Sequence, residues 1–329
     1  MLFSMQFMGS MLLDLVFGDP RSIPHPVQGI GWFCNRYEFW TRKLFARARV
    51  AGAIAFLLVL TSTVAIVAGL LVLLHSFSVV GESIVAVLLL YSSVACRDLQ
   101  RHSLEVYWAL TRGAPIETAR EKLSWIVGRD TASLDKAGVS RATVETVAEN
   151  LVDGVTAPIF FALIFSTMPL DGLVSPISLA AIGAYFYKAI NTMDSMYGYK
   201  NEQYIEFGTV AARVDDFANF LPARLTGVLL VVTALVLRLD ARAAWRVLWR
   251  DRLQHSSPNA GHPEAAVAGA LGIQLGGTSN YFGKPVHKPT LGDAVRPVSP
   301  EDIKLTNKMM FVSSGLFAFL FLAFRTWII

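Results

Sequence analysis

A polar segment between two long apolar runs carries side chains that could bind a metal ion or a phosphate. It covers residues 188–200, and a second polar segment at residues 212–224 follows it closely. Charged and amide side chains cost free energy wherever they lose water, so a protein that only spans a membrane has little use for them beside its helices. We therefore expect a functional site at the membrane boundary.

The two segments combine oxygen ligands with cations. Asp194, Asp215 and Asp216 supply carboxylates, and Asn219 supplies an amide oxygen. A site that holds both a metal and a phosphorylated substrate requires this composition, although an ion-pair network that neutralises itself would share it. The cations, which suit a phosphate or a carboxylate as partner, are Lys188, Lys200, Arg213 and Arg224.

Three more carboxylates recur at intervals of four residues. In a helix, Glu145, Glu149 and Asp153 share one face, with Asn150 beside it. Like charges so placed repel one another unless a cation lies among them, and Mg²⁺ is a divalent ion that prefers oxygen ligands and bridges phosphates. The alternative is a solvated helix face, which is weakened because the series runs into an apolar segment at Asp153.

Turns and loops supply the remaining candidates. Asp19, Arg21 and His25 can converge in a proline-stiffened turn, although a capped helix end would have the same sequence. Arg129 lies in a long polar loop. The run at 257–266 is typical of a turn that opens a helix, whose free N–H groups bind anions. The glycines that follow suit either a close approach to a ligand or helix packing alone.

The composition indicates that most of the chain lies in or against lipid. Hydrophobic residues make up 53% of the chain and charged residues 16%, whereas about a quarter of a soluble domain is charged. The mean hydropathy is +0.47. The run at 2–17 predicts a shallow or re-entrant helix and is unlike a signal peptide. Runs near the roughly 20 residues that cross a bilayer lie at 50–74, 79–96, 151–170, 172–190, 220–237 and 309–329.

Basic loops mark the cytoplasmic side of a membrane protein, but they do not give one consistent topology for this chain. Two helical hairpins, at 50–96 and 151–190, would place the polar loops between spans on the cytoplasmic side. The basic loop after residue 237 then falls on the opposite side. Either the segment 151–170 fails to cross, or the alanine- and glycine-rich run 265–277 dips back into the membrane.

We therefore predict an all-α, polytopic integral membrane protein in which polar loops and interfacial helices form a site at one membrane face. Residues 1–329 are expected to form a single domain, with long polar loops at about 97–150, 191–219 and 238–308. The last loop begins with an amphipathic helix, which either lies on anionic lipid or steers phosphates. Its arginines recur every four residues, at Arg238, Arg242, Arg246 and Arg250.

The motifs of several common cofactor sites are missing from the sequence. The two cysteines, Cys34 and Cys96, form no spacing motif and carry no information on redox state. No glycine fingerprint of a dinucleotide fold, Walker sequence or zinc-ligand spacing is found.

The polar motifs, taken together, resemble one known family: the adenosylcobinamide-phosphate synthases of cobalamin (vitamin B12) biosynthesis, also called the CobD/CbiB family. Six motifs in the right order span nearly the whole chain, which makes them far more specific than any one alone. They are LDLVFGDP with PHPV (residues 13–27), GRDT (128–131), ETVAEN (145–150), KAINTMDSM (188–196), DDFANFLPAR (215–224) and SPNAGHPE (257–264).

The resemblance implies a multi-pass enzyme of the inner membrane that is an amide-bond-forming ligase. It would join the carboxyl group of adenosylcobyric acid, a corrinoid, to the amine of aminopropanol or aminopropanol O-phosphate. ATP would be the co-substrate and Mg²⁺ the metal, because a carboxylate needs activation, most simply as an acyl phosphate. The expected partners are these substrates, the lipid bilayer and other membrane-associated cobalamin enzymes, and no nucleic acid.

Residue roles follow from the resemblance and from the side-chain chemistry. The expected catalytic residues are Asp19, His25, Glu149, Lys188, Asp194 and Asp216. The expected substrate- or phosphate-binding residues are Arg21, Arg129, Asn150, Asn191, Arg213, Asn219, Arg224, Asn259 and His262. The expected metal ligands are Glu145, Glu149, Asp153, Asp194, Asp215 and Asp216.

Three other functions remain as alternatives. A Mg-dependent membrane transferase of a prenyl or phosphatidyl group would also need an aspartate-rich motif, but the motif at 215–219 has no second copy. A secondary transporter usually shows repeated halves and acids in the middle of its spans, and neither is found. A non-catalytic scaffold that holds a biosynthetic complex at the membrane is the third.

Overall fold

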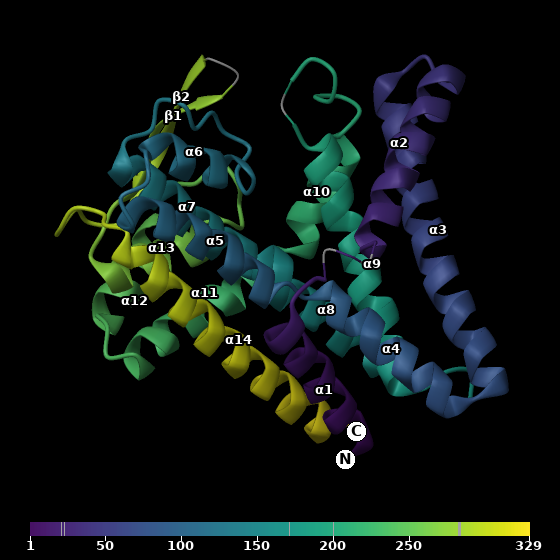
Figure 1. Cartoon of the computed structure of the whole chain (residues 1–329). Helices are drawn as coiled ribbons and strands as arrows, with labels where there is room; N and C mark the ends of the chain where they lie inside the picture. Colours follow the sequence, from purple (N-terminus) through teal and green to yellow (C-terminus); the bar gives the residue numbers. More distant parts are fainter. Residues whose placement is uncertain (21, 23, 171, 200, 282–283) are drawn as a thin grey trace. The chain divides into compact units, whose positions relative to one another are not determined.

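The computed structural model shows a helical chain that also contains a β-hairpin (Figure 1). The structure describes every residue except Arg21, Ile23, Asp171, Lys200, Phe282 and Gly283. The chain divides into two compact units, which are Met1–Ala95 with Ala157–Asn219 and Leu320–Ile329, and Cys96–Thr156 with Phe220–Phe319. The prediction of an all-α polytopic membrane protein is confirmed. The single domain over 1–329 stays a prediction.

Helix α9 (Pro176–Tyr197) is the central helix of the first unit. Its small residues let neighbouring backbones approach, and at Gly183 an added Cβ would lie 2.4 Å from the carbonyl oxygen of Phe161 in α8. Most α9 side chains are therefore buried. The helices that pack against it are α1 (Leu2–Phe17), α2 (Pro26–Leu44), α3 (Ala48–Phe77), α4 (Val79–Ser93), α8 (Ala157–Ser166) and α10 (Thr209–Ala218).

A buried carboxylate ties the turn between α3 and α4 to the start of α9. Glu82 is fully buried and accepts a hydrogen bond of 2.7 Å from the backbone N–H of Ser175, which precedes α9. The ring of His75 contacts the other carboxylate oxygen at 2.8 Å. A negative charge at a helix N-terminus is favourable, so Glu82 fixes the position of the helix that carries Lys188, Asn191 and Asp194.

Helix α13 (Gly261–Leu271) forms the core of the second unit, and every one of its residues is buried. It packs against α7, α11 and α12 and against both strands. The run 265–277, considered as a membrane dip, therefore begins as a core helix. The other elements are α5 (Cys96–Thr111), α6 (Ile116–Ser124), α7 (Lys136–Leu151), a π-turn (Val152–Thr156), α11 (Phe220–Val236), α12 (Ala241–Asp251) and α14 (Glu301–Ile328), which continues into the first unit.

The hairpin of β1 (Leu275–Tyr281) and β2 (Lys284–Leu291) lies where the sequence suggested only a polar loop. The antiparallel register slips between Leu275 and Gly277, which marks a bulge. Gly276 and Gly277 both have positive φ values, of 80° and 87°, a conformation that residues with a Cβ rarely adopt. The bulge frees the backbone N–H of Gly276 for a side chain of α7.

Four helical stretches are long and apolar enough to cross a membrane, within the part of the chain that the structure describes. Their bounds are Ala48–Phe77, Val79–Thr111, Lys136–Ser166 and Glu301–Ile328. A fifth candidate joins α10 and α11 across a break at Asn219. The remaining expected span, 172–190, corresponds to α9, which is not among these candidates; two tyrosines and Lys188 lie in its apolar run. The structure thus describes a multi-pass membrane protein.

Helix α12 differs from the expected row of four arginines. Arg238 lies in the turn before it with a φ of 57°, so it is not part of the helix. Arg246 and Arg250 form ion pairs with Asp293, at 3.0 and 2.8 Å. Trp245 and Trp249 are exposed. Part of the cationic face is therefore paired with a carboxylate of the same chain, at the protein surface.

Candidate functional site

In the first unit, α9, α10 and the residue after α10 bring four polar side chains together, three of them predicted for the site. The buried carboxylate of Asp215 accepts hydrogen bonds from the amides of Asn191, at 3.5 Å, and Asn219, at 3.0 Å. The hydroxyl of Tyr187 donates to the Asn219 amide oxygen at 2.9 Å. Both oxygens of Asp215 are thus held by amides, and the network fixes the junction of the two helices.

The other predicted residues of α9 and α10 are more accessible. Lys188, Asp194 and Asp216 are partly exposed, and Arg213 is exposed. The Asp194 side chain covers the turn after α9, where a Cβ on Gly198 would lie 2.2 Å from its Oδ1 atom. Only glycine leaves Asp194 this position, so the turn and the carboxylate depend on each other.

Asp19 and His25 meet in the turn before α2, as expected. The Nε2 atom of His25 lies 3.5 Å from a carboxylate oxygen of Asp19. The Nδ1 atom accepts a hydrogen bond from the backbone N–H of Val27 and so caps α2, which has proline in its first turn. The alternative of a capped helix end is therefore also true of this turn. Arg21, the third predicted member, lies outside the described residues.

In the second unit, Glu145 joins three parts of the chain. Its carboxylate forms an ion pair of 2.5 Å with Arg129 and accepts a hydrogen bond of 2.7 Å from the N–H of Gly276. Both side chains of the pair are almost buried, with 5% and 11% of their surface exposed. A buried carboxylate needs such partners to offset the loss of water, so Glu145 positions the Arg129 loop against α7 and the hairpin.

Glu264 of α13 lies within range of the charges of Glu145 and Glu149, and Lys288 and Arg129 oppose them. Burial, together with the two neighbouring carboxylates, raises the pKa of Glu264 well above its ordinary value. The Nε2 atom of His255 lies 3.8 Å from a carboxylate oxygen of Glu264. Burial, with the charge of Lys288, lowers the pKa of His255 to about 4. The carboxyl of Glu264, with its raised pKa, therefore faces an imidazole that is neutral at pH 7.

Asp153 does not extend the Glu145 and Glu149 series as expected. It lies in the π-turn that follows α7, and a wider turn shifts the residues after it around the helix axis. Glu149 is exposed, and the amide of Asn150 bonds to the backbone oxygen of Thr146.

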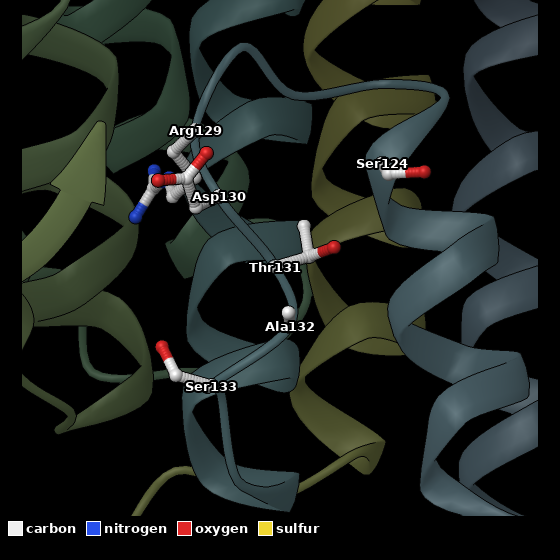
Figure 2. A pocket seen from close by; sticks show the side chains of 6 residues that line it. All are labelled: Ser124, Arg129, Asp130, Thr131, Ala132 and Ser133. Carbon is white, nitrogen blue, oxygen red and sulfur yellow. The ribbon is translucent and has the colours of Figure 1, made fainter. Parts of the chain in front are cut away.

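A cavity of about 450 Å³ opens beside the loop between α6 and α7. Figure 2 shows Arg129 and Asp130 close together in this loop, while the Ser124 hydroxyl points away from them. Hydroxyl groups and a guanidinium can bind the oxygens of a phosphate. The lining residues are Ser124, Arg129, Asp130, Thr131, Ala132 and Ser133.

Arg224, Asn259 and His262 also lie together, at the start of α13. A guanidinium nitrogen of Arg224 donates to the Asn259 amide oxygen at 3.1 Å. The sequence predicted an anion site from the free N–H groups of this helix, but few are free. The Ser257 hydroxyl accepts from the N–H groups of Asn259 and Ala260. The N–H of His262 donates to the backbone oxygen of Asn259, and Pro263 has no N–H.

The predicted metal ligands divide between the two units. Among the described residues, no three His, Cys, Asp or Glu side chains are grouped so that they could hold a metal ion. Mg²⁺ is commonly bound by one or two carboxylates together with water and substrate phosphates. Carboxylates that could contribute one or two such ligands are present in both units, but the set of six ligands, Mg²⁺ and ATP all stay predictions.

The sequence interpretation missed several members of these clusters. Glu264 was part of a recognised motif but was given no role, and His255 and Lys288 were not considered. Lys288 lies in the hairpin, which brings its charge near Glu264. It is more than a hundred residues from α7 in the sequence, so no local pattern predicts the contact. The only local signal was the pair of glycines at 276 and 277, since a double glycine is typical of a bulge.

Comparisons with known proteins agree on one family. The family model described as "CobD/Cbib protein" matches residues 7–310. The "Cobalamin biosynthesis protein CobD" of Desulfotalea psychrophila is 48% identical over 98% of both chains. That of Klebsiella pneumoniae is 45% identical over 97% of this chain and 96% of its own. The "Cobalamin biosynthesis protein CbiB" of Salmonella choleraesuis is 44% identical over 95% of each. No solved structure matches the chain.

Proposed function

This chain belongs to the CobD/CbiB family, and from that premise we propose that it is the ligase that completes adenosylcobinamide or its phosphate. The relatives are named as cobalamin biosynthesis proteins, so the chain has a role in cobalamin biosynthesis. The proposed reaction joins adenosylcobyric acid to aminopropanol or aminopropanol O-phosphate with ATP, at the inner membrane. The observation that carries the proposal is the family match over residues 7–310.

The chemistry has two steps. The corrinoid carboxylate attacks the terminal phosphorus of ATP, which forms an acyl phosphate and releases ADP. The amine nitrogen then attacks the acyl carbon, inorganic phosphate leaves, and the nitrogen loses a proton. Mg²⁺, when bound with ATP, would neutralise charge on the phosphates. The protein must therefore bind the phosphates, hold the corrinoid carboxylate away from its own carboxylates, and accept the proton that the amine loses.

The described residues offer each of these roles. Lys188 and Arg213 in the first unit, and Arg129 and Arg224 in the second, are the cations proposed to contact phosphates. Asp194, Asp216 and Glu149 keep accessible carboxylates for a Mg–ATP complex.

His25, beside Asp19, is the proposed proton acceptor. His255 is neutral at pH 7 because burial lowers its pKa to about 4. Its Nδ1 atom already accepts a hydrogen bond of 3.0 Å from the backbone N–H of Ser257, so we do not assign it the role of the base.

The test is synthesis by the purified protein in detergent. Adenosylcobyric acid, aminopropanol O-phosphate, ATP and Mg²⁺ should give adenosylcobinamide phosphate, ADP and inorganic phosphate in equal amounts, measured by liquid chromatography and mass spectrometry. Leaving out either the corrinoid or the amine should stop formation of the product. A folded preparation that makes no product with either amine would overturn the proposal.

Matched variants distinguish an enzyme from a scaffold. Asp216→Asn should lose most of the turnover, because the amide keeps the shape but not the charge. Glu202→Gln, at an exposed position in the loop before α10, should keep the parental rate. A scaffold would keep its function in both variants.

A further inference from the structure

Three side chains that can carry positive charge meet where α11, the end of α12 and the start of α13 come together. The charges of Arg224 and Arg252 both act on the ring of His262. Neither guanidinium forms an ion pair with a carboxylate of the described residues. Other arginines of this unit do form such pairs: Arg129, Arg246, Arg250 and Arg296. A cationic cluster without a counter-charge is costly unless an anion binds to it.

Close backbone contacts hold the cluster in place. A Cβ on Gly261 would lie 2.4 Å from the carbonyl oxygen of Arg252, so the start of α13 packs directly on the end of α12. A Cβ on Gly227 would lie 3.3 Å from the Cβ atom and from the backbone oxygen of His262, so the first turn of α13 packs closely on α11. The geometry therefore does not depend on flexible side chains alone.

The individual side chains are also oriented. Arg224 donates to the backbone oxygen of Phe220 at 2.7 Å and to Asn259 at 3.1 Å. Arg252 lies over the ring of Trp249, 3.9 Å from its centre, and donates to the backbone oxygen of the same residue. Each guanidinium uses some of its five N–H groups in this way, and the others remain for a ligand.

The His262 ring supplies the second, independent observation. Its Nε2 atom is buried and has no hydrogen-bond partner, and only 4% of the residue is exposed. Buried ring nitrogens almost always have a partner. An anion between the guanidinium groups would accept a hydrogen bond from this nitrogen and offset the charge of both arginines.

We propose that Arg224, Arg252 and His262 form a binding site for a substrate phosphate group. A phosphate has enough oxygens to accept from two guanidinium groups and an imidazole at the same time. Arg252 is new to the site, and the helix N-terminus contributes little because its N–H groups are used. The identity of the phosphate rests on the proposed function, which offers two sources: aminopropanol O-phosphate and ATP.

The experiment measures binding without turnover. The full-length protein in detergent, free of Mg²⁺ and corrinoid, is titrated by calorimetry with inorganic phosphate, aminopropanol O-phosphate, aminopropanol and ADP. We expect the phosphate-bearing ligand to bind and free aminopropanol to bind at least tenfold more weakly. Tighter binding of aminopropanol O-phosphate than of ADP assigns the site to the amine substrate, and the reverse assigns it to the nucleotide.

Two variants connect the binding to these residues. Arg252→Gln removes one charge, and His262→Phe keeps a ring but removes its nitrogens, so each should weaken phosphate binding about tenfold or more. Arg242→Gln, at an exposed position of α12, removes the same charge elsewhere and should bind like the parent. Melting temperature and gel filtration confirm that each variant is folded.

Some results would overturn the inference. They are no binding of any phosphate by the parent, parental affinity in both folded variants, or an equal loss in Arg242→Gln. These outcomes are independent of the ligase assay. If Arg252→Gln makes adenosylcobinamide phosphate with parental KM values for ATP and for the amine, the phosphate site is wrong and the ligase stands. If phosphate binding needs Arg252 but the parent forms no product, the phosphate site stands and the ligase proposal is wrong.

Discussion

Arg224 illustrates how one guanidinium can make structural hydrogen bonds and also offer N–H groups to a ligand. We expect Arg224→Lys to lower turnover about tenfold or more, because lysine keeps the charge but not the planar fork that binds two oxygens at once. Steady-state kinetics measure this, with the melting temperature as a check on folding. Arg242→Lys is the matched control. Near-parental turnover in Arg224→Lys would remove Arg224 from the site and favour a role at lipid headgroups.

The buried histidines predict how stability changes with pH. The pKa values of His255 and His262 fall to about 4, from about 6.5 in the unfolded chain. The unfolded state thus binds more protons between pH 4 and 6.5, so each histidine makes the protein less stable as the pH falls through that window. The full effect is up to about 3 kcal/mol for each histidine.

The measurement compares variants, because Glu264 acts in the opposite direction. Its raised pKa makes the folded state less stable as the pH rises. His255→Gln should therefore narrow the loss in melting temperature between pH 7 and pH 5, whereas replacement of the exposed His287 should not. An unchanged pH profile in His255→Gln would show that His255 is not held neutral.

At the residue scale, the sequence predicted which side chains gather better than it predicted their partners. The contacts between Asp19 and His25 and between Asp215 and Asn219 join residues close in the chain, so a turn or one helix step determines them. Glu264 was harder, because its apolar neighbours give it the pattern of a core helix.

At the scale of elements, helix packing depends on glycines that leave no room for a side chain. Gly183→Val should lower the melting temperature and the yield strongly, since its Cβ would overlap the backbone of α8 and the ring of Phe165; overpacking typically costs about 1–3 kcal/mol. Gly69→Val on α3, where nothing lies within 4 Å of the added Cβ, is the control. Equal stability of the two variants would contradict the tight contact of α8 and α9.

The apolar runs were readily predicted, whereas two departures from regular helix were not. A hydrophobic run of about 20 residues is a strong signal, and α3 and α14 follow it. The π-turn at Val152–Thr156 leaves no clear trace in composition. The hairpin was hidden because prolines at 285 and 289 are unusual in strands. Both departures change which side chains meet around α7.

At the scale of the whole molecule, dependence on a metal tests whether Mg²⁺ comes with the substrate. Excess EDTA should abolish turnover, and added Mg²⁺ should restore it, because ATP is used as its Mg²⁺ complex. The melting temperature should not change, since the metal is expected to bind with the phosphates. Full activity in EDTA would assign the carboxylates another purpose. A large fall in melting temperature would indicate a resident structural ion.

The sequence also predicts that the polar motifs of both units face the same side of the membrane, and cysteine labelling tests this directly. The native thiols Cys34 and Cys96 are buried, with 0% and 4% of their surface exposed. The labelling of single cysteines introduced elsewhere can therefore be measured without first replacing the native ones. Exposed serines in three of the motif regions are suitable positions: Ser22, Ser133 and Ser195.

In sealed vesicles of known orientation, a membrane-impermeant maleimide should label all three variants from the cytoplasmic side only. Ser76→Cys, at the far end of the apolar helix α3, should react from the opposite side, because that helix is long enough to cross and the basic residues before it stay inside. The reason for expecting one shared face is chemical, since one acyl phosphate must meet the amine without crossing lipid. If Ser133→Cys and Ser195→Cys react from opposite sides, the prediction of one shared membrane face is wrong.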